Sequence, residues 1–497
     1  MRYCAKIENE GRPGSVVWGL FCLLGAALLI LSGCKTLEPE PSPGLPMNMP
    51  KTFSGQAKSP IPTDLIREWW LSMGSEELNG LIREGLDQSY DLKVLHAKIL
   101  QARAGLEKEN ASLKPGLDFS FGGERTHTRT QVSRGQGGET KGGHSWDGSL
   151  TGSYTVDAWG KARAATKSSA LALDAAQQDY EDAALELTAD ISGTWVDIIS
   201  VRNRRKILEN QIKLNTTHLE LLKLRFLNGR ASALDVSQQR EALAEALALS
   251  PLLEKEEILL LNTLGFLIGR TPGQPISVDT RDLPGPAPLP GPGIPANLLE
   301  NRADIRAAWM RLLSSRFEVE AAKADLLPSF TLSAKALFSS GQLDLLFHNW
   351  VASLGAAVAG PLFDGGEKKA EVKRTRAVVQ EQLNLYARTV AKAIQEVEDS
   401  LVTLDKQASY IRQLELELET ARLTLKDARI QYFNGQSSYL NYLTARVGIE
   451  KLERQLVSER AAIIKEEIGF YRVLGWQAPL GSELDQNKEP GQIIGEK

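Results

Sequence analysis

Cys34 is the residue whose surroundings most clearly indicate covalent chemistry. The chain has three cysteines, Cys4, Cys22 and Cys34. An apolar run at 16–31 ends directly before Ser32-Gly33-Cys34, and such a run followed by small residues is typical of a signal peptide and its cleavage site. We therefore expect cleavage before Cys34 and acylation of its sulfur, which would leave no free thiol in the mature chain.

The other reactive side chains do not form a recognisable catalytic or metal-binding pattern. No two of the five histidines, His96, His127, His144, His218 and His348, stand at the spacing of a helical metal site. We find no nucleophile motif and no phosphate-binding loop, and Gly365-Gly366 indicates a turn, because glycine accepts positive φ. We expect no catalytic residues, no metal ligands, no cofactor beyond the lipid on Cys34 and no enzymatic activity.

The composition excludes further classes of protein. Of 497 residues, 42% are apolar and 24% are charged, which is enough apolar material for a folded core. The mean hydropathy of −0.22 excludes a polytopic helical membrane protein, whereas a transmembrane barrel of half-apolar strands remains compatible. The net charge of −4 offers no basic excess for nucleic acid.

The sequence contains two tandem copies of one unit. Asn228-Gly229 matches Asn434-Gly435 at an offset of 206 residues, and Pro115 matches Pro328 at an offset of 213. We expect these divisions: a signal peptide at 1–33, an acylated, Pro-rich tether at 34–77, a first repeat at 78–281, a Pro/Gly linker at 282–295, a second repeat at 296–477 and a polar tail at 478–497.

Each repeat is expected to contain a very long helix, a sharp turn and a returning helix. The segments 163–227 and 367–433 contain no proline, and at ~1.5 Å per residue each spans roughly 100 Å. Each carries two apolar stripes. In the second copy one stripe includes Leu414, Leu418 and Leu425, and the other consists of Leu416, Leu423 and Ile430. Two stripes indicate two neighbouring helices, as in a helical tube, although an ordinary bundle is the alternative.

Each repeat also contains one earlier helix and two strand-like segments. The helix of the first repeat is expected at about 78–113. Period-two alternation predicts strands around 117–121, 146–156, 330–338 and 350–358, and the stretch 122–144, with His127 and His144, is expected to be a solvated loop. Four strands cannot close a barrel in lipid, so other chains must complete the sheet. The sequence does not choose between two chains and three.

Several motifs along the duplicated chain resemble those of the TolC-type outer-membrane efflux proteins, and more narrowly the NodT-like lipoproteins of RND efflux systems. Ser32-Gly33-Cys34 resembles a lipobox, and the other motifs cover nearly the whole remaining chain: Trp69-Trp70, Glu77-Leu78-Asn79-Gly80-Leu81-Ile82, Asn301-Arg302-Ala303-Asp304-Ile305-Arg306, Leu327-Pro328-Ser329-Phe330, Gly360-Pro361-Leu362-Phe363-Asp364-Gly365-Gly366, and Arg225-Phe226-Leu227-Asn228-Gly229 with its copy at 431–435.

The resemblance implies a homotrimer of mixed α and β structure in the outer membrane of a Gram-negative bacterium. Its twelve-stranded β-barrel, four strands per chain, would continue into a twelve-helix periplasmic α-barrel. It would be a passive exit duct for small molecules delivered by a periplasmic adaptor protein and an inner-membrane RND pump.

The resemblance also assigns roles to the hairpin turns. The first turn would contact the adaptor through Arg225, Asn228, Gly229, Arg230, Ser232 and Asp235, and the second through Asn434, Gly435, Gln436 and Ser438. The periplasmic gate would include Tyr432, Tyr439, Leu440, Asn441, Tyr442 and Thr444. Asn441 and Thr444 stand where TolC has aspartates, so the gate is expected to be held by packing of Tyr439, Leu440 and Tyr442 together with Asp235.

Two alternatives remain at this point. One is a duct for type I protein secretion, and the other is a structural coiled-coil lipoprotein without a channel, which would leave the strand-like segments unexplained. The sequence does not identify the transported substrate, the particular pump and adaptor, or how the gate opens.

Overall fold

The computed structural model describes residues 46–53, 68–130, 139–285 and 295–475. The expected signal peptide 1–33, Cys34 and the polar tail 478–497 lie outside these ranges, as do much of the tether and the middle of the linker. The chain divides into two compact units. The first holds residues 103–171 and 313–381, and the second holds 44–102, 172–312 and 382–497, apart from the segments outside the described ranges.

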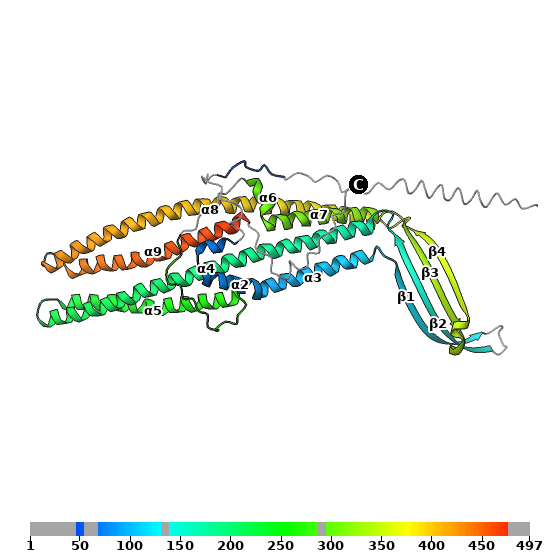
Figure 1. The fold of residues 1–497 in the computed structure, drawn as a ribbon, viewed down its shortest axis with the longest axis horizontal. Helices are drawn as coiled ribbons and strands as arrows, with labels where there is room; N and C mark the ends of the chain where they lie inside the picture. Colours follow the sequence, from blue (N-terminus) through cyan, green and yellow to red (C-terminus); the bar gives the residue numbers. More distant parts are fainter. Residues whose placement is uncertain (1–45, 54–67, 131–138, 286–294, 476–497) are drawn as a thin grey trace, which may run out of the picture. The chain divides into compact units, whose positions relative to one another are not determined.

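The first unit contains a four-stranded antiparallel sheet. Its order is β1 (Gly116–Thr130), β2 (Glu139–Val156), β3 (Ser329–Ser340) and β4 (Trp350–Ala359). Figure 1 shows these strands running side by side, with the 3-10 helix η4 (Leu343–His348) between β3 and β4.

The pairing of these strands collects their apolar side chains on one face. Phe119 pairs with Leu150, Leu150 with Ala336, and Ala336 with Ala352. The register is continuous in all three pairs, and side chains alternate between faces. The opposite face is mainly polar, with rows such as Ser120–Ser149, whose hydroxyls lie 2.8 Å apart.

The prediction of a solvated loop at 122–144 is wrong. β1 and β2 stay paired as far as Thr130 opposite Glu139, so His127 and His144 lie in strands. The apolar alternation stops after Phe121, but ladder hydrogen bonds do not need apolar side chains, and the threonines of this stretch favour extended backbone.

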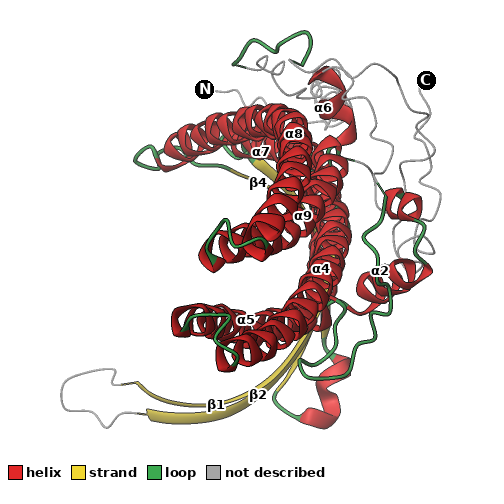
Figure 2. Cartoon of the chain, turned by 90° about the vertical axis from the view of Figure 1, so that its left-hand side faces the viewer, coloured by secondary structure: helices red, strands yellow, loops and turns green. Residues whose placement is uncertain are grey.

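The second unit is helical. Its elements are η2 (Trp69–Met73), α2 (Glu76–Gln88), α3 (Tyr90–Ala111), α4 (Lys161–Leu227), α5 (Ala233–Leu267), η3 (Pro295–Asn297), α6 (Leu298–Asn301), α7 (Ala303–Ala324), α8 (Glu367–Phe433) and α9 (Tyr439–Leu474). Four of them, α3, α4, α7 and α8, also have residues in the first unit. Figures 1 and 2 show α4 with α5, and α8 with α9, as two long helical hairpins. The two predicted long helices are confirmed as α4 and α8.

The predicted single helix at 78–113 is wrong, because the chain forms α2 and α3 with a break at Ser89. Ser89 has extended backbone (ψ 130°), and its N–H closes α2 on the carbonyl of Gly85. Gly85 lets α2 pack closely against α4, because a Cβ at this position would lie 2.4 Å from the side chain of Ile191.

The core of the second unit joins segments from both repeats. Trp69 is 1% exposed and stacks on Tyr471 of α9 at 5.3 Å. Trp195 of α4, also 1% exposed, donates its Nε1–H to Glu77 Oε1 at 2.7 Å. Residues 69–77, which the sequence placed in the tether, therefore pack with the folded helices.

The motif at 301–306 has a structural role. The guanidinium of Arg302 donates to Asp304 and to the carbonyl of Val473, at 2.8 Å and 2.9 Å, and lies 2.8 Å from Glu396. It thus ties the start of α7 to α8 and to the end of α9. Within the described ranges, no helix combines the length and apolar character needed to span a membrane.

Candidate functional site

The turn between α4 and α5 is a compact reversal with capping hydrogen bonds at both helix ends. Gly229 has φ +69°, and its N–H bonds to the carbonyl of Phe226 while that of Arg230 bonds to Arg225. This pairing ends a helix at a left-handed glycine. Ser232 and Asp235 then start α5 with a reciprocal capping box, in which each side chain accepts the other's backbone N–H, at 3.1 and 2.9 Å.

The turn between α8 and α9 repeats this geometry with one change. Gly435 has φ +72°, and Gly435 and Gln436 donate to the carbonyls of Tyr432 and Gln431. Ser438 precedes α9 without a side-chain cap bond, and Asn441, in the place of Asp235, donates instead to Ser437 Oγ at 2.9 Å. The second turn therefore lacks the carboxylate that caps the first.

An aromatic cluster lies next to the turns. Tyr432 of α8 stacks on Tyr442 of α9 at 6.0 Å and meets Tyr439 edge-on at 5.4 Å. The guanidinium of Arg225, at the end of α4, lies 5.1 Å from the ring centre of Tyr432, a cation–π distance. His218 of α4 stacks on Tyr442 at 6.1 Å. The cluster thus joins the two hairpins of one chain.

A buried polar chain continues this junction. Tyr439, 2% exposed, donates its hydroxyl to Gln239 Oε1 of α5, and Gln239 Nε2 donates to the carbonyl oxygen and Oδ1 of Asn215 in α4, at 2.9 and 3.0 Å. Deeper along the hairpins, Gln211 of α4 donates to the carbonyl of Glu450 in α9 at 3.1 Å and accepts from Arg454. Removing one partner from such a buried chain leaves a polar atom unsatisfied.

Arg446 places a positive charge inside this junction. It is 6% exposed, its Nε lies 3.2 Å from Glu450 Oε1, and its Nη1 and Nη2 have no hydrogen-bond partner in the part of the chain that the structure describes. Burial, Arg446 and Arg429 together lower the pKa of His218. Burial raises the pKa of Glu450, which Arg446 opposes. His218 is therefore held in its neutral form beside a buried cation.

The structure separates the predicted gate residues into two groups. Tyr432, Tyr439 and Tyr442 come together in the aromatic cluster. Leu440, Asn441 and Thr444 are exposed, and the carboxylate of Asp235 is taken up by its capping box. Among the described residues, no group of three histidine, cysteine or acidic side chains could hold a metal ion.

Four residues of this junction were not predicted from the sequence: Gln211, Asn215, Gln239 and Arg446. A signal was present: Gln211, Asn215 and His218 follow each other at steps of four and three on α4, and Arg446, Glu450 and Arg454 at steps of four on α9. Polar residues at helical spacing within an apolar seam indicate a buried polar contact between helices.

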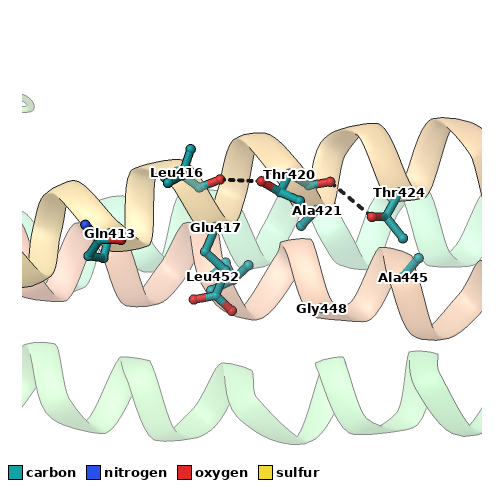
Figure 3. A pocket seen from close by; sticks show the side chains of 9 residues that line it. All are labelled: Gln413, Leu416, Glu417, Thr420, Ala421, Thr424, Ala445, Gly448 and Leu452. Atoms are coloured by element: carbon teal, nitrogen blue, oxygen red, sulfur yellow. Dashed lines mark hydrogen bonds between the residues drawn. The ribbon is translucent and has the colours of Figure 1, made fainter.

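A groove of about 640 Å³ lies between α8 and α9 (Figure 3). Its lining residues are Gln413, Leu416, Glu417, Thr420, Ala421, Thr424, Ala445, Gly448 and Leu452. The hydroxyls of Thr420 and Thr424 donate to carbonyls of their own helix, at 2.9 and 3.1 Å, so they do not point into the groove as free donors. The groove offers mainly space beside small residues rather than chemistry.

The sheet carries two aromatic groups, one near each end of its apolar face. At the hairpin end, Phe121 stacks on Trp146 at 6.1 Å, and Phe338 meets Phe347 at 5.4 Å. At the helix end, Trp159 lies 6.2 Å from Phe330. The segment from Phe330 to Phe338 has nine residues, within the roughly 9–11 that a tilted strand needs to cross a bilayer. Aromatic belts around an apolar band are typical of membrane-crossing strands.

Comparisons with known proteins agree with this geometry. The chain is 29% identical over 464 residues to the pyoverdine export outer membrane protein OpmQ of Pseudomonas aeruginosa, covering 91% of this chain and 96% of that protein. It is 27% identical over 450 residues to nodulation protein T of Rhizobium leguminosarum bv. trifolii, covering 90% and 94%. The solved structure of the outer-membrane channel OprN has the same fold, with a TM-score of 0.80 at 24% identity, covering 88% of this chain and 98% of that one.

The family model described as outer membrane efflux protein matches residues 81–270 and 294–476. These two segments make up well over half of the chain and correspond to its two repeats. The chain belongs to the outer membrane efflux protein family.

Proposed function

We propose that three copies of this outer membrane efflux protein form one passive exit duct. The four-stranded sheets would join into a twelve-stranded barrel in the outer membrane, and the hairpins into a twelve-helix tube in the periplasm. A periplasmic adaptor and an RND pump would deliver small molecules to the tube. The observation that carries the proposal is a sheet with one apolar face and, among the described strands, two unpaired edges.

The sheet edges favour assembly. β1 pairs only with β2, and β4 only with β3, within the described sheet. In lipid, each backbone N–H or C=O group left without a hydrogen bond at these edges would raise the free energy by several kcal/mol. Pairing β1 of one copy with β4 of the next removes both edges and turns exposed residues such as Phe119 and Leu354 (84% and 89% exposed) toward lipid.

The helices also carry apolar surface that one chain does not cover. Leu414 and Leu418 of α8 pack in a cluster with Ile449 and Leu456 of α9. The second stripe stays exposed: Leu416, Leu423 and Ile430 are 57%, 60% and 50% accessible, and Leu214 and Leu221 of α4 are 53% and 48% accessible. Helices of neighbouring copies would cover these stripes, with the groove beside Gly448 giving room for close approach.

The turns are the proposed adaptor contact. A Cβ at Gly229 or at Gly435 would meet nothing within 4 Å, Leu227 is 79% exposed, and residues 433–436 are exposed. Both turns therefore present side chains outward. We expect Gly229→Leu to leave trimers intact and to abolish chemical cross-linking to the adaptor. Normal cross-linking in this variant would count against a role for the turn.

The lipid anchor is a further part of the proposal. Acylation of Cys34 would attach the chain to the membrane through the Pro-rich tether. Mass spectrometry of the mature N-terminal peptide tests it: an acylated cysteine is expected, and an unmodified chain that still begins at Met1 would contradict it.

Disulfide cross-linking between copies tests how many chains the assembly contains. A double variant with cysteines at Asp118 of β1 and Ser353 of β4, both on the polar face, should cross-link neighbouring copies into products that end at three chains. The matched control places cysteines at Ser149 of β2 and at Ser353. It should give no cross-linked products, because β2 lies between β1 and β3 and does not form an edge of the sheet. Products that end at two chains, or that extend beyond three, would contradict the trimer.

A further inference from the structure

A basic patch lies on the sheet beyond its apolar band. It consists of Arg125, His127 and Arg129 of β1 and His144 of β2, all exposed. The β1–β2 register is continuous from Gly116 to Thr130, so these β1 residues share a face with Phe119 and Phe121, and His144 stands opposite Arg125 on that face.

Contacts on this face support the placement. A Cβ at Gly123 would lie 2.6 Å from the ring of Trp146, and a Cβ at Gly142 would lie 2.9 Å from the ring of His127. The two glycines therefore leave room for rings that lie flat on the sheet. Along β1 the face changes from apolar Phe119, through the stacked pair Phe121–Trp146, to the basic patch within a few residues.

The charge of the patch is not neutralised by the described chain. Neither Arg125 nor Arg129 forms an ion pair with a described residue. The nearby acids Glu124 and Asp147 are at positions that alternate to the opposite face. An anion outside the chain is therefore the natural counter-charge.

We propose that the basic patch binds the phosphate groups of a phosphorylated glycolipid in the outer leaflet of the outer membrane. The inference rests on the proposed function, in which the apolar face of the sheet meets lipid and the helices lie in the periplasm.

Aromatic rings mark the membrane interface, and lipid phosphates begin just beyond it. The patch lies at the end of β1 and β2 away from their connections to α3 and α4, which is the outer-leaflet end. Arginine binds phosphate with paired, charge-assisted hydrogen bonds.

Native mass spectrometry of the full-length, detergent-extracted protein tests this binding. The probes are lipid A with both phosphates, lipid A with the phosphates removed, and inorganic phosphate as a competitor. We expect the double variant Arg125→Gln/Arg129→Gln to bind phosphorylated lipid A roughly thirtyfold more weakly, since each basic side chain near a membrane surface contributes a factor of about five.

Two control variants show whether binding depends on positive charge at the basic patch or on the positive charge of the sheet as a whole. Lys141→Gln/Lys335→Gln removes two positive charges from the opposite face and should bind like the wild type. Arg125→Lys/Arg129→Lys keeps the charge and should restore most of the binding. Free inorganic phosphate should not displace the lipid, because contacts of the acyl chains with the apolar face and with the stacked pair Phe121–Trp146 also contribute to lipid binding.

Several outcomes would overturn the inference. They are equal binding by wild type and the glutamine variant, equal loss in the opposite-face control, indifference to the lipid phosphates, or displacement by inorganic phosphate. Conductance is recorded on the same preparations. A wild type that forms no conducting trimer contradicts the proposed function, whereas a conducting trimer without phosphate preference contradicts only the lipid site.

Discussion

Tyr439 is the residue that joins the two hairpins most directly. Its buried hydroxyl donates to Gln239, which is itself fully buried and bonded to Asn215. Tyr439→Phe keeps the ring but leaves Gln239 Oε1 without this donor, which should lower the stability of the junction by about 1–3 kcal/mol.

In this variant we predict faster amide hydrogen exchange at the start of α9 and in α5 around Gln239. Leu440→Ala, at the exposed neighbour, is the control. Unchanged exchange in Tyr439→Phe would show that the bond does not hold the hairpins together.

His218 makes the same junction sensitive to acid. Its pKa is lowered by burial and by Arg446 and Arg429, so the folded state binds this proton more weakly than the unfolded state. The contribution to stability is complete above the ordinary histidine pKa of about 6.5 and is lost as the pH falls toward the lowered value. We predict that α4 around His218 opens more readily at about pH 5.5 than at about pH 7.5, after correction for intrinsic exchange.

His218→Phe keeps a ring against Tyr442 and cannot bind the proton. This variant should lose that part of the pH dependence, whereas His96→Phe in α3 should keep it. A wild type and a His218→Phe variant with identical pH profiles would contradict the assignment.

At the scale of elements, the repeated glycines divide into two kinds. Gly229 and Gly435 have positive φ, but a Cβ at either would meet nothing within 4 Å. Gly269 and Gly475, both at φ +77°, approach other segments so closely that a Cβ would lie 2.4 Å from the carbonyl oxygen of Gln88 and 2.7 Å from the Cα of Arg302. The first pair allows a turn, and the second pair also allows close packing.

Alanine substitutions should separate these two roles. Gly229→Ala and Gly435→Ala should each cost about 1–2 kcal/mol, from the left-handed backbone alone. Gly269→Ala and Gly475→Ala also bring a Cβ against the backbone of Gln88 or Arg302. They should therefore reduce the folded yield and the thermal stability much more than the substitutions at Gly229 and Gly435. Equal losses at all four positions, measured by thermal unfolding of the extracted protein, would contradict this division.

The elements also show how far the sequence predicts the fold. Helical spacing and the matched turns predicted α4, α8 and both hairpin turns, because these features are local. The break at Ser89 lies beside the close contact of Gly85 with Ile191, and the extension of β1 and β2 follows their backbone pairing. Both involve residues far apart in the sequence. The candidate site divides in the same way. The duplicated motif predicted Gly229 and Gly435, and the family resemblance pointed to Tyr432, whereas Gln239 and Arg446 matter only because the two hairpins meet.

In the whole molecule, several copies of the chain must assemble to cover the surfaces that one copy leaves exposed. In the described part of one chain, the sheet has two open edges, and α4 and α8 each carry a second, exposed apolar stripe. Leu221→Glu/Leu423→Glu places charges in these stripes and should prevent trimer formation while each chain keeps its helix content by circular dichroism. Leu440→Glu, an exposed leucine outside the stripes, should still form trimers. Normal trimers from the first variant would show that the stripes do not meet other copies.

Conductance of mass-selected oligomers in planar lipid bilayers shows whether three chains together form the channel. Each species of the extracted wild-type protein is separated by mass and added to a bilayer. We expect discrete, reproducible channels from the three-chain species and none from single chains, because four strands cannot close around water. A three-chain species that forms no channel, or single chains that conduct equally well, would contradict this expectation.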